Sequence, residues 1–248
     1  MISVDFKSLV SKADLDFKER LGGPNAERGL PVGNGRMGTL LWTAPEQSKL
    51  HIQVNHTDVF AFRNSSASTR RDRGDPGHQF YCNGCGFVDI DLGENVFTET
   101  AVRNHLAVYD AVAEVAGKGI RTRTFVWHRK DVIAVEITDQ RSEPKPIAVD
   151  LRMLRPPVDI TGPHSATSSL AAVGQDIELT QEFREKGDRP TALDLNSFTV
   201  LRARVIGRAS VAAKVDERSI RLTAPAGRGP LIVLIALGQS KTETLEQV

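Results

Sequence analysis

The polar side chains best suited to chemistry begin in a glycine-rich stretch near the amino end of the chain. This stretch, Gly29–Trp42, reads GLPVGNGRMGTLLW and carries Asn34 and Arg36. Glycine accepts positive φ angles and lets backbone approach another group closely, so the spacing predicts a tight turn that opens a strand. An asparagine amide donates and accepts hydrogen bonds, and an arginine presents a rigid fork of donors. The turn therefore offers two side chains that suit a hydroxylated ligand.

The next strand-like run, LHIQVNHTDVFAF, carries three more polar residues, Asn55, His56 and Asp58. With Asn34 and Arg36 they form our set of candidates for substrate binding or for contact with another domain. In the binding hypothesis, these groups hydrogen-bond the hydroxyls of a sugar. In the structural alternative, Asn34 caps its own turn while Arg36 and Asp58 tie two loops together, because turn Asn and Asp residues commonly bond nearby backbone. The sequence leaves both hypotheses open.

Several carboxylates are available for acid–base chemistry. Glycoside hydrolysis requires two carboxyl groups that face one another across the scissile bond. The first half of the chain offers Asp58, Asp75, Asp89, Asp91 and Glu94. Asp89 and Asp91 stand two residues apart in an alternating run, so they share one face of a strand, and we expect both to point to solvent.

Cysteine, histidine and glycine motifs give little sign of a cofactor. Cys82 and Cys85 form a single C-x-x-C, and His78 lies four residues before it, which makes a weak candidate for a three-ligand metal site. The alternatives are two small residues in a turn or a disulfide. GNGRMG matches the letters of a dinucleotide loop, but a strand-like run and no helix follows it. Neither a phosphate loop nor a G-x-S-x-G elbow occurs, so we expect no cofactor and no metal.

Short apolar runs separated by turn residues follow the glycine stretch, and many alternate with the period of two expected of a half-buried strand. A turn at 116–119 joins two of them as a hairpin would. We expect one short helix at most within Val4–Leu21, and long loops at Asn64–His78, Leu154–Leu170 and Arg184–Asn196. The pattern predicts an all-β, antiparallel sandwich of roughly a dozen or more strands. The expected strands are Met37–Trp42, Leu50–Val54, Phe87–Leu92, Phe97–Arg103, Ala107–Val115, Ile120–His128, Val132–Thr138, Ile147–Met153, Asp176–Phe183, Phe198–Ile206, Ser210–Val215, Ser219–Ala224 and Leu231–Leu237.

Aromatic residues are scarce, at 6% of the chain. Trp42 and Trp127 both lie in apolar runs. An exposed Trp127 would suit the apolar face of a sugar ring, but packing in the core or at a sheet edge is the expectation for an indole, which buries a large area.

The run PVGNGRMG, followed by a strand and an Asn-x-x-Asp segment (Asn55 and Asp58), resembles the N-terminal domain of glycoside hydrolase family 95 enzymes. The fuller match, through VNHTDVFAF, CNGCGFVDIDLG and DLRMLRPP, is most similar to the domain of unknown function 5703 family. The resemblance covers about half the chain and implies a β-supersandwich at the front of a large bacterial glycoside hydrolase. In those proteins an (α/α)6-barrel that follows the sandwich carries the catalytic carboxylates. The resemblance therefore implies no catalytic residue here, and it implies a chain truncated before its barrel.

Length and composition set further bounds. The 248 residues suit one large domain, and we divide them into an irregular lead-in (1–28), a β-sandwich (29–240) and a tail or truncated linker (241–248). A net charge of +1 argues against a nucleic-acid partner. No apolar run is long enough to cross a membrane. The amino end lacks the pattern of a signal peptide, so localisation stays unknown, although the resemblance implies export of the full-length parent.

We carry two hypotheses of different classes. In the first, the chain is a non-catalytic sandwich domain of a glycoside hydrolase, of a fucosidase-like lineage, whose partners are carbohydrate and a helical barrel of the same parent protein. In the second, it is an independent carbohydrate-binding module. A third, a small hydrolase complete in itself, has the least support. The first hypothesis predicts an exposed apolar patch on one face of the sandwich, because the partner that covers it is missing.

Overall fold

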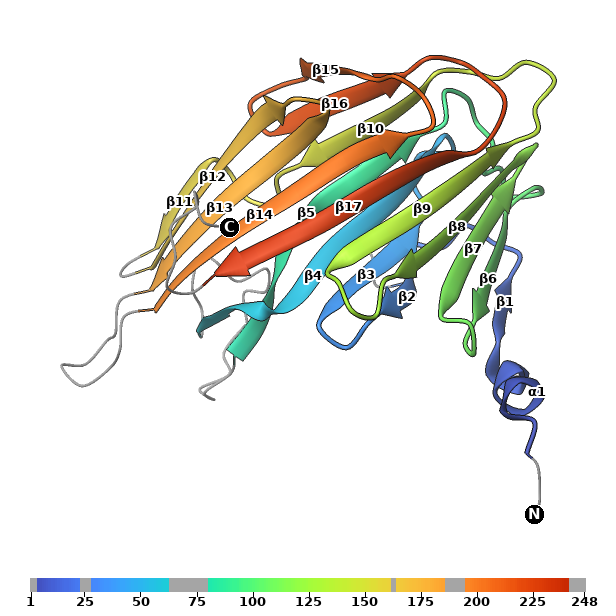
Figure 1. Cartoon of the computed structure of the whole chain (residues 1–248), viewed down its shortest axis with the longest axis horizontal. Coiled ribbons are helices and arrows are strands. Elements are labelled where there is room, and N and C mark those ends of the chain that lie inside the picture. Colours follow the sequence, from blue (N-terminus) through green and yellow to red (C-terminus); the bar gives the residue numbers. More distant parts are fainter. Residues whose placement is uncertain (1–3, 23–27, 63–79, 162–163, 186–194, 241–248) are drawn as a thin grey trace.

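Two antiparallel sheets make up most of the described structure (Figure 1). The computed structural model describes residues 4–22, 28–62, 80–161, 164–185 and 195–240. One sheet has ten strands, in the order β1-β6-β7-β8-β9-β17-β14-β13-β12-β11, and the other has seven, in the order β15-β16-β10-β5-β4-β3-β2. An all-β sandwich with little helix is thus confirmed.

The ten-stranded sheet consists of β1 (Leu15–Phe17), β6 (Arg103–Ala107), β7 (Val112–Gly117), β8 (Ile120–Val126), β9 (Val132–Asp139), β11 (Val158–Thr161), β12 (His164–Val173), β13 (Asp176–Glu185), β14 (Leu195–Ile206) and β17 (Leu231–Ser240). The seven-stranded sheet consists of β2 (Leu30–Gly33), β3 (Met37–Trp42), β4 (Lys49–Phe62), β5 (Phe80–Asp91), β10 (Ile147–Arg152), β15 (Val211–Lys214) and β16 (Ser219–Ala224). Helix α1 (Phe6–Val10) and a 3₁₀ turn (Ser11–Ala13) precede β1, and α1 lies beyond the edge of the sandwich (Figure 1). Among the described residues, no helix is long and apolar enough to cross a membrane.

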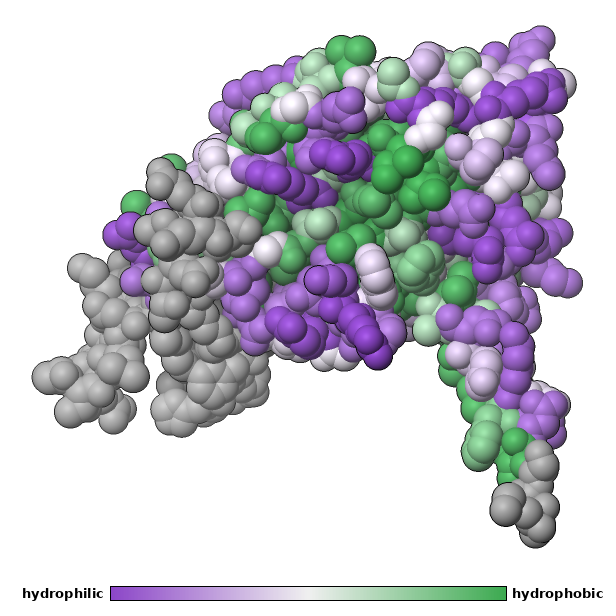
Figure 2. Space-filling view, in the orientation of Figure 1, coloured by the Kyte–Doolittle hydropathy of each residue, from purple (hydrophilic) through white to green (hydrophobic). Residues whose placement is uncertain are grey.

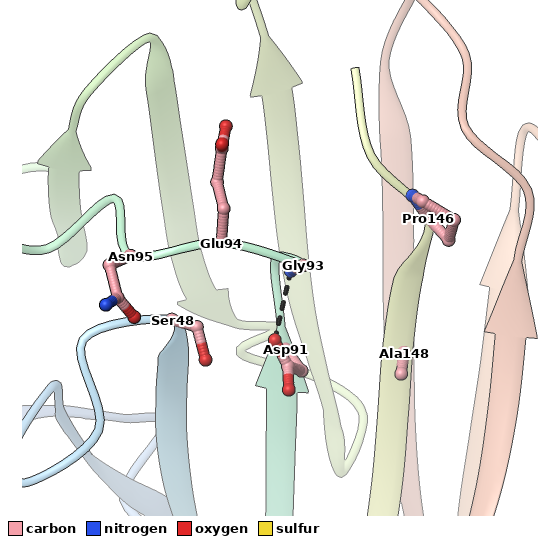
Figure 3. Close-up of a pocket in the computed structure, with 7 residues that line it drawn as sticks. All are labelled: Ser48, Asp91, Gly93, Glu94, Asn95, Pro146 and Ala148. Atoms are coloured by element: carbon pink, nitrogen blue, oxygen red, sulfur yellow. Dashed lines mark hydrogen bonds between the residues drawn. The ribbon is translucent and has the colours of Figure 1, made fainter. Parts of the chain in front are cut away.

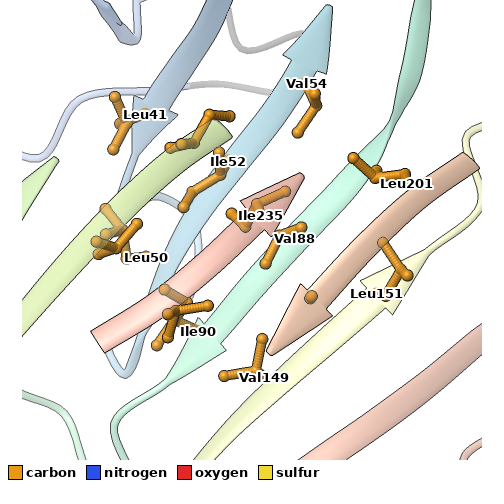
Figure 4. Packing of buried hydrophobic residues seen from close by; sticks show 14 of the residues in the cluster. Leu41, Leu50, Ile52, Val54, Val88, Ile90, Val149, Leu151, Leu201 and Ile235 are labelled. Atoms are coloured by element: carbon orange, nitrogen blue, oxygen red, sulfur yellow. The ribbon is translucent and has the colours of Figure 1, made fainter. Parts of the chain in front are cut away.

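The core lies between the two sheets and follows directly from the alternation of the strands. In β9 every second residue, starting at Ile133, is buried, and β17 repeats the pattern from Leu231. Figure 4 shows Ile52 and Val88 of the seven-stranded sheet packed near Ile235 of the ten-stranded sheet. Because successive side chains of a strand point to opposite faces, each sheet keeps a second face outside this core.

The long pair β4–β5 has an irregular register that matters for the site. The pairing shifts between Val54 and Asn55 and again between Asn55 and Phe60. Gly86 lies at the first shift, where its φ of +143° is open to glycine and strained for other residues. Such bulges bend a strand and re-aim its side chains. This one separates the regular part of β4 from the segment that carries His56 and Asp58.

The expected elements differ from the observed ones in several places. Phe97–Arg103 is a loop rather than a strand, and it is anchored by the buried Phe97, whose N–H bonds Gln47. Ala107–Val115 is split by a turn in which Ala111 has a φ of +52°. The expected loop Leu154–Leu170 contains β11 and most of β12.

Two strands near the amino end were not expected: β1, which pairs with β6, and β2, which pairs with β3. The expected strand Leu50–Val54 also extends further, as β4, to Phe62. The hairpin turn at 116–119 is confirmed, since β7 ends at Gly117 and β8 begins at Ile120. The expected loop Asn64–His78 lies outside the described residues, as does most of Arg184–Asn196.

Candidate functional site

The glycine-rich turn links β2 to β3, and Asn34 organises it. The Asn34 Oδ1 accepts hydrogen bonds from the backbone N–H groups of Arg36 (2.9 Å) and Met37 (2.7 Å). The backbone N–H of Asn34 bonds the Met37 carbonyl at 3.0 Å. Gly35 supplies the positive φ of +91° that the turn requires. Asn34 therefore has the local backbone role that one of the two sequence hypotheses assigned to it.

The same side chain also joins the two sheets. Its Nδ2 lies 3.1 Å from the carbonyls of Trp127 and Lys130 and 3.4 Å from Asp131 Oδ1, all in the turn between β8 and β9. One amide thus connects the β2–β3 turn of the seven-stranded sheet with the β8–β9 turn of the ten-stranded sheet. These contacts use both ends of the amide, which leaves little of it for a ligand.

Charged residues surround this junction. An Arg36 guanidinium nitrogen lies 3.3 Å from Asp58 Oδ2 and 3.6 Å from Asp131 Oδ2. His56 is buried, and its Nδ1 accepts the Asp58 N–H at 3.1 Å, so the ring proton sits on Nε2 in the neutral form. The Nε2 lies 3.2 Å from Asp131 Oδ2 but without the alignment of a hydrogen bond. The arrangement is an ion-paired junction between two turns and the irregular part of β4, and it has no nucleophile held by a base.

Four of the five candidate residues therefore come together, and Asn55 does not. Its side chain accepts a hydrogen bond from Gln53 at 3.3 Å on the other face of β4. The sequence analysis missed Asp131 and Gln239, whose amide donates to Asp58 at 3.4 Å. Asp131 stands directly before an expected strand, but only the closing of the two sheets places it beside His56.

A second polar cluster, on the outer face of the seven-stranded sheet, was also missed. His51 lies between two carboxylates, with Nδ1 2.8 Å from Asp89 and Nε2 2.9 Å from Glu46. Arg152 donates to the other oxygen of Asp89 at 3.0 Å, and the Trp42 ring stacks on His51 at 5.4 Å between centroids. No sequence signal pairs these residues, because the strand register alone places them opposite one another.

Asp89 corrects one expectation, since it is buried rather than directed to solvent. Burial on its own raises the pKa of this carboxyl. The hydrogen bonds from His51 and Arg152 outweigh that effect, so the pKa of Asp89 lies below its ordinary value. A carboxylate held in its charged form by two fixed partners is suited to structural pairing and poorly suited to donating a proton.

The remaining carboxylates line a shallow depression of about 320 Å³ at one end of the seven-stranded sheet (Figure 3). Asp91 accepts the Gly93 N–H at 3.0 Å, and the Glu94 side chain extends away from it. Two carboxyl groups that serve hydrolysis face one another across a space of a few ångströms. Asp91 and Glu94 do not have that arrangement. The third candidate of this group, Asp75, lies outside the described residues.

The metal candidate is only partly visible. Cys85 is buried in the core, whereas His78 and the side chain of Cys82 lie outside the described residues. Within the described part of the chain, no group of three or more His, Cys, Asp or Glu side chains is placed to hold a metal ion. The weak prediction for His78, Cys82 and Cys85 stays a prediction.

The outer face of the ten-stranded sheet is apolar at its centre, as Figure 2 shows. Cross-strand pairs place Phe125 beside Ala134 and Ala134 beside Leu234. Trp127 is 51% exposed on this face, so it is neither a core nor a packed edge residue. We call the set the apolar face. Its members are Phe125, Trp127, Val132, Ala134, Ile206, Ile232, Leu234 and Ala236.

Ion pairs border the apolar face on two sides. Arg123 pairs with Glu114 at 3.1 Å and Glu136 at 3.5 Å on the β7–β9 side. On the β13–β14 side, Arg202 pairs with Glu178 and Arg204 with Asp176. An apolar centre with a polar rim is the usual anatomy of a protein–protein interface.

Comparison with known proteins adds little to this geometry. No family model matches the chain, and no curated protein is similar to it in sequence. Among solved structures, it matches a putative kojibiose phosphorylase from human microbiome with a TM-score of 0.46 and 11% sequence identity over 93% of this chain. The chain spans 34% of the length of that structure. A likeness at this level assigns no activity to the chain.

Proposed function

We propose that this chain is a non-catalytic β-sandwich domain of a bacterial glycoside hydrolase of the family 95 type, and that it packs on the helical catalytic barrel of its parent. The single observation that carries the proposal is the apolar face. Soluble monomers rarely expose a contiguous apolar surface of several strands, and a rimmed one marks a contact site. The lineage rests on the PVGNGRMG run and the segments that follow it.

The composition of the apolar face favours a protein over a glycan as its partner. Six of its eight members are aliphatic, and only Phe125 and Trp127 offer a ring to a sugar. Aliphatic side chains neither donate nor accept hydrogen bonds, whereas every hydroxyl of a bound sugar needs a partner. The independent carbohydrate-binding module therefore remains the second candidate, and the exposed Trp127 is the observation in its favour.

The side-chain contacts described above also support a non-catalytic role. Arg36, Asp58 and His56 are engaged with one another and with Asp131. Asp89 is held by His51 and Arg152. Groups fixed in this way hold turns and strands in place. Where described carboxyl groups face one another, as Glu46 with Asp89 and Asp58 with Asp131 do, a basic side chain of the protein, His51 or Arg36, lies between them.

The test begins with the reading frame that encodes the chain, followed past Val248 for a segment long enough to form a helical barrel. That segment, produced separately, is titrated into the chain by calorimetry. We expect a 1:1 complex that Leu234→Asp weakens at least about thirtyfold, the size of an interface hot spot of 2 kcal/mol. Val211→Asp is the matched control, because Val211 is an aliphatic residue 74% exposed on the other sheet.

Hydrolysis assays of the isolated chain with 4-nitrophenyl glycosides complete the test. We expect no turnover above the protein-free rate. Turnover that Asp58→Asn or Asp89→Asn abolishes contradicts the proposal, as does barrel binding that Leu234→Asp leaves unchanged.

A further inference from the structure

A row of neutral polar side chains crosses the inner surface of the ten-stranded sheet, where apolar residues are the rule. Ser168 of β12 pairs across to Gln181 of β13, Gln181 to Thr199 of β14, and Thr199 to Gln239 of β17. Leu179 and Leu201, two residues along the same strands, are fully buried in the core. The row therefore faces the other sheet rather than solvent.

The row is continuous with the charged junction at the surface. Arg36 is 60% exposed and pairs with Asp58 at 3.3 Å, and Asp58 accepts the Gln239 amide at 3.4 Å. At the next step inward, the Thr199 hydroxyl lies 3.4 Å from the Gln181 carbonyl oxygen. We call Ser168, Gln181, Thr199 and Gln239 the polar row. A path of polar groups thus leads from solvent into the space between the sheets.

Hydrogen bonding in the polar row is incomplete. Ser168 Oγ, Gln181 Nε2 and Gln239 Oε1 are buried, and they have no hydrogen-bond partner among the described residues. The orientation of the Gln239 amide follows from its hydrogen bond to Asp58. A carboxylate oxygen accepts from the amide nitrogen, so the amide oxygen points inward. More than nine in ten buried polar groups in proteins have a partner. Three such exceptions along one row, on β12, β13 and β17, point to an occupant that bonds them.

The chemistry of these groups defines that occupant. The open positions are an N–H donor, a carbonyl acceptor and a hydroxyl that can do either. All four side chains of the row are neutral, so the row itself supplies no counter-charge to a charged ligand, whose burial would then be unfavourable. A hydroxyl group donates and accepts at once and carries no charge. We propose that the polar row is a binding site for the hydroxyl groups of a small neutral molecule, with ordered water or a sugar as their source.

Only the sugar source rests on the proposed carbohydrate function, because the site itself follows from the unpartnered atoms. The experiment uses the wild-type chain and records the side-chain amide signals of Gln181 and Gln239 by NMR. Water-to-amide NOEs test for ordered water, and titrations with D-glucose, D-galactose, L-fucose and L-rhamnose test for a sugar. The exposed Gln140 is the internal control.

One substitution tests the same site through stability. Ser168→Ala removes only an unpartnered hydroxyl, so it lowers the melting temperature by about 2–4 °C if an occupant is lost. Ser142→Ala, at an exposed serine, is the matched control and is expected to leave the melting temperature unchanged. In a dry row, removing an unpartnered polar atom is neutral or stabilising instead.

The NMR and stability results distinguish a sugar-binding site, a water-binding site and no site. Long-lived water NOEs at Gln181 with saturable sugar shifts that Gln181→Met abolishes support the site with a sugar as source. Water NOEs without any sugar response support the site with water as source and overturn the sugar. Absent NOEs together with an unchanged or raised melting temperature for Ser168→Ala overturn the proposal. None of these results depends on Leu234 or on a barrel, so failure here is distinct from failure of the proposed function.

Discussion

Replacing Asp89 by Asn tests whether the buried charge cluster stabilises the seven-stranded sheet. The carboxylate is 5% exposed and accepts hydrogen bonds from His51 at 2.8 Å and Arg152 at 3.0 Å. The amide keeps the shape of the side chain but removes its charge and presents an N–H where an acceptor was needed. His51 is then left buried against a single carboxylate, Glu46, on its far side.

The expected loss can be worked out contact by contact. A hydrogen bond to a charged group contributes about 1.5–3 kcal/mol. The Arg152 side chain is 39% exposed, so its share is discounted to about 0.2–1 kcal/mol as for a surface pair. The sum is about 2–4 kcal/mol of unfolding free energy. For a chain of this size that corresponds to a fall of roughly 5–15 °C in the melting temperature.

Urea denaturation across pH is the assay, with Asp91→Asn as the matched control. Asp91 lies on the same face of β5, where its carboxylate accepts the Gly93 N–H in the shallow depression. The pKa of Asp89 is lower in the folded chain than its ordinary value. The contribution of Asp89 to the free energy of unfolding is therefore complete above the pKa of the unfolded chain, about 4. It is lost as the pH falls through the lower pKa of the folded chain.

The difference between wild type and Asp89→Asn should accordingly shrink in acid. Equal and small effects of the two substitutions at pH 7, or a difference that grows as the pH is lowered, would refute the reasoning.

Three further predictions follow from single residues. Gly86→Ala is expected to cost about 1–3 kcal/mol in urea denaturation, because its φ is +143° and a new Cβ would lie 2.9 Å from a core leucine methyl; a neutral effect contradicts the bulge geometry. Acrylamide should quench the tryptophan fluorescence of the Trp42→Phe variant, which keeps only the exposed Trp127, far more than that of the Trp127→Phe variant, which keeps only Trp42, 7% exposed. Equal quenching contradicts the placement of both residues. Asn34→Ala should cost about 1–2 kcal/mol through its turn bonds, and Arg36→Ala less than about 1, because that side chain is 60% exposed; the reverse order in thermal unfolding contradicts the turn assignment.

The strands that were predictable from the sequence are those with apolar residues on one face and more polar, exposed residues on the other. Val132–Thr138 alternates because one face lines the core and the other is exposed, so β9 was expected where it occurs. β12, HSATSSLAAV, was missed because Ser168 points inward to the polar row, and the strand has polar residues on both faces. Phe97 was wrongly assigned to a strand. An apolar residue in the sequence indicates burial, but a loop can bury such a residue as well as a strand can.

The candidate site was predictable only as far as local spacing reaches. The glycine spacing around Asn34 indicated a turn, and the structure has one. Asp131, a partner of that turn, lies 97 residues beyond Asn34, and Gln239 lies 181 residues beyond its partner Asp58. Contacts of this kind depend on how the sheets close. The same is true of His51 and Asp89, whose pairing follows from the β4–β5 register.

Hydroxyl-radical footprinting tests most directly whether the apolar face is a docking surface. Oxidation of Phe125, Trp127 and Leu234 is measured in the chain alone and in complex with the helical barrel that the proposed function requires of the parent protein. We predict that all three side chains become protected while the exposed Tyr109 and Val211, which lie outside the apolar face, stay equally reactive. Unchanged oxidation of the three residues in a complex that forms would contradict the claim.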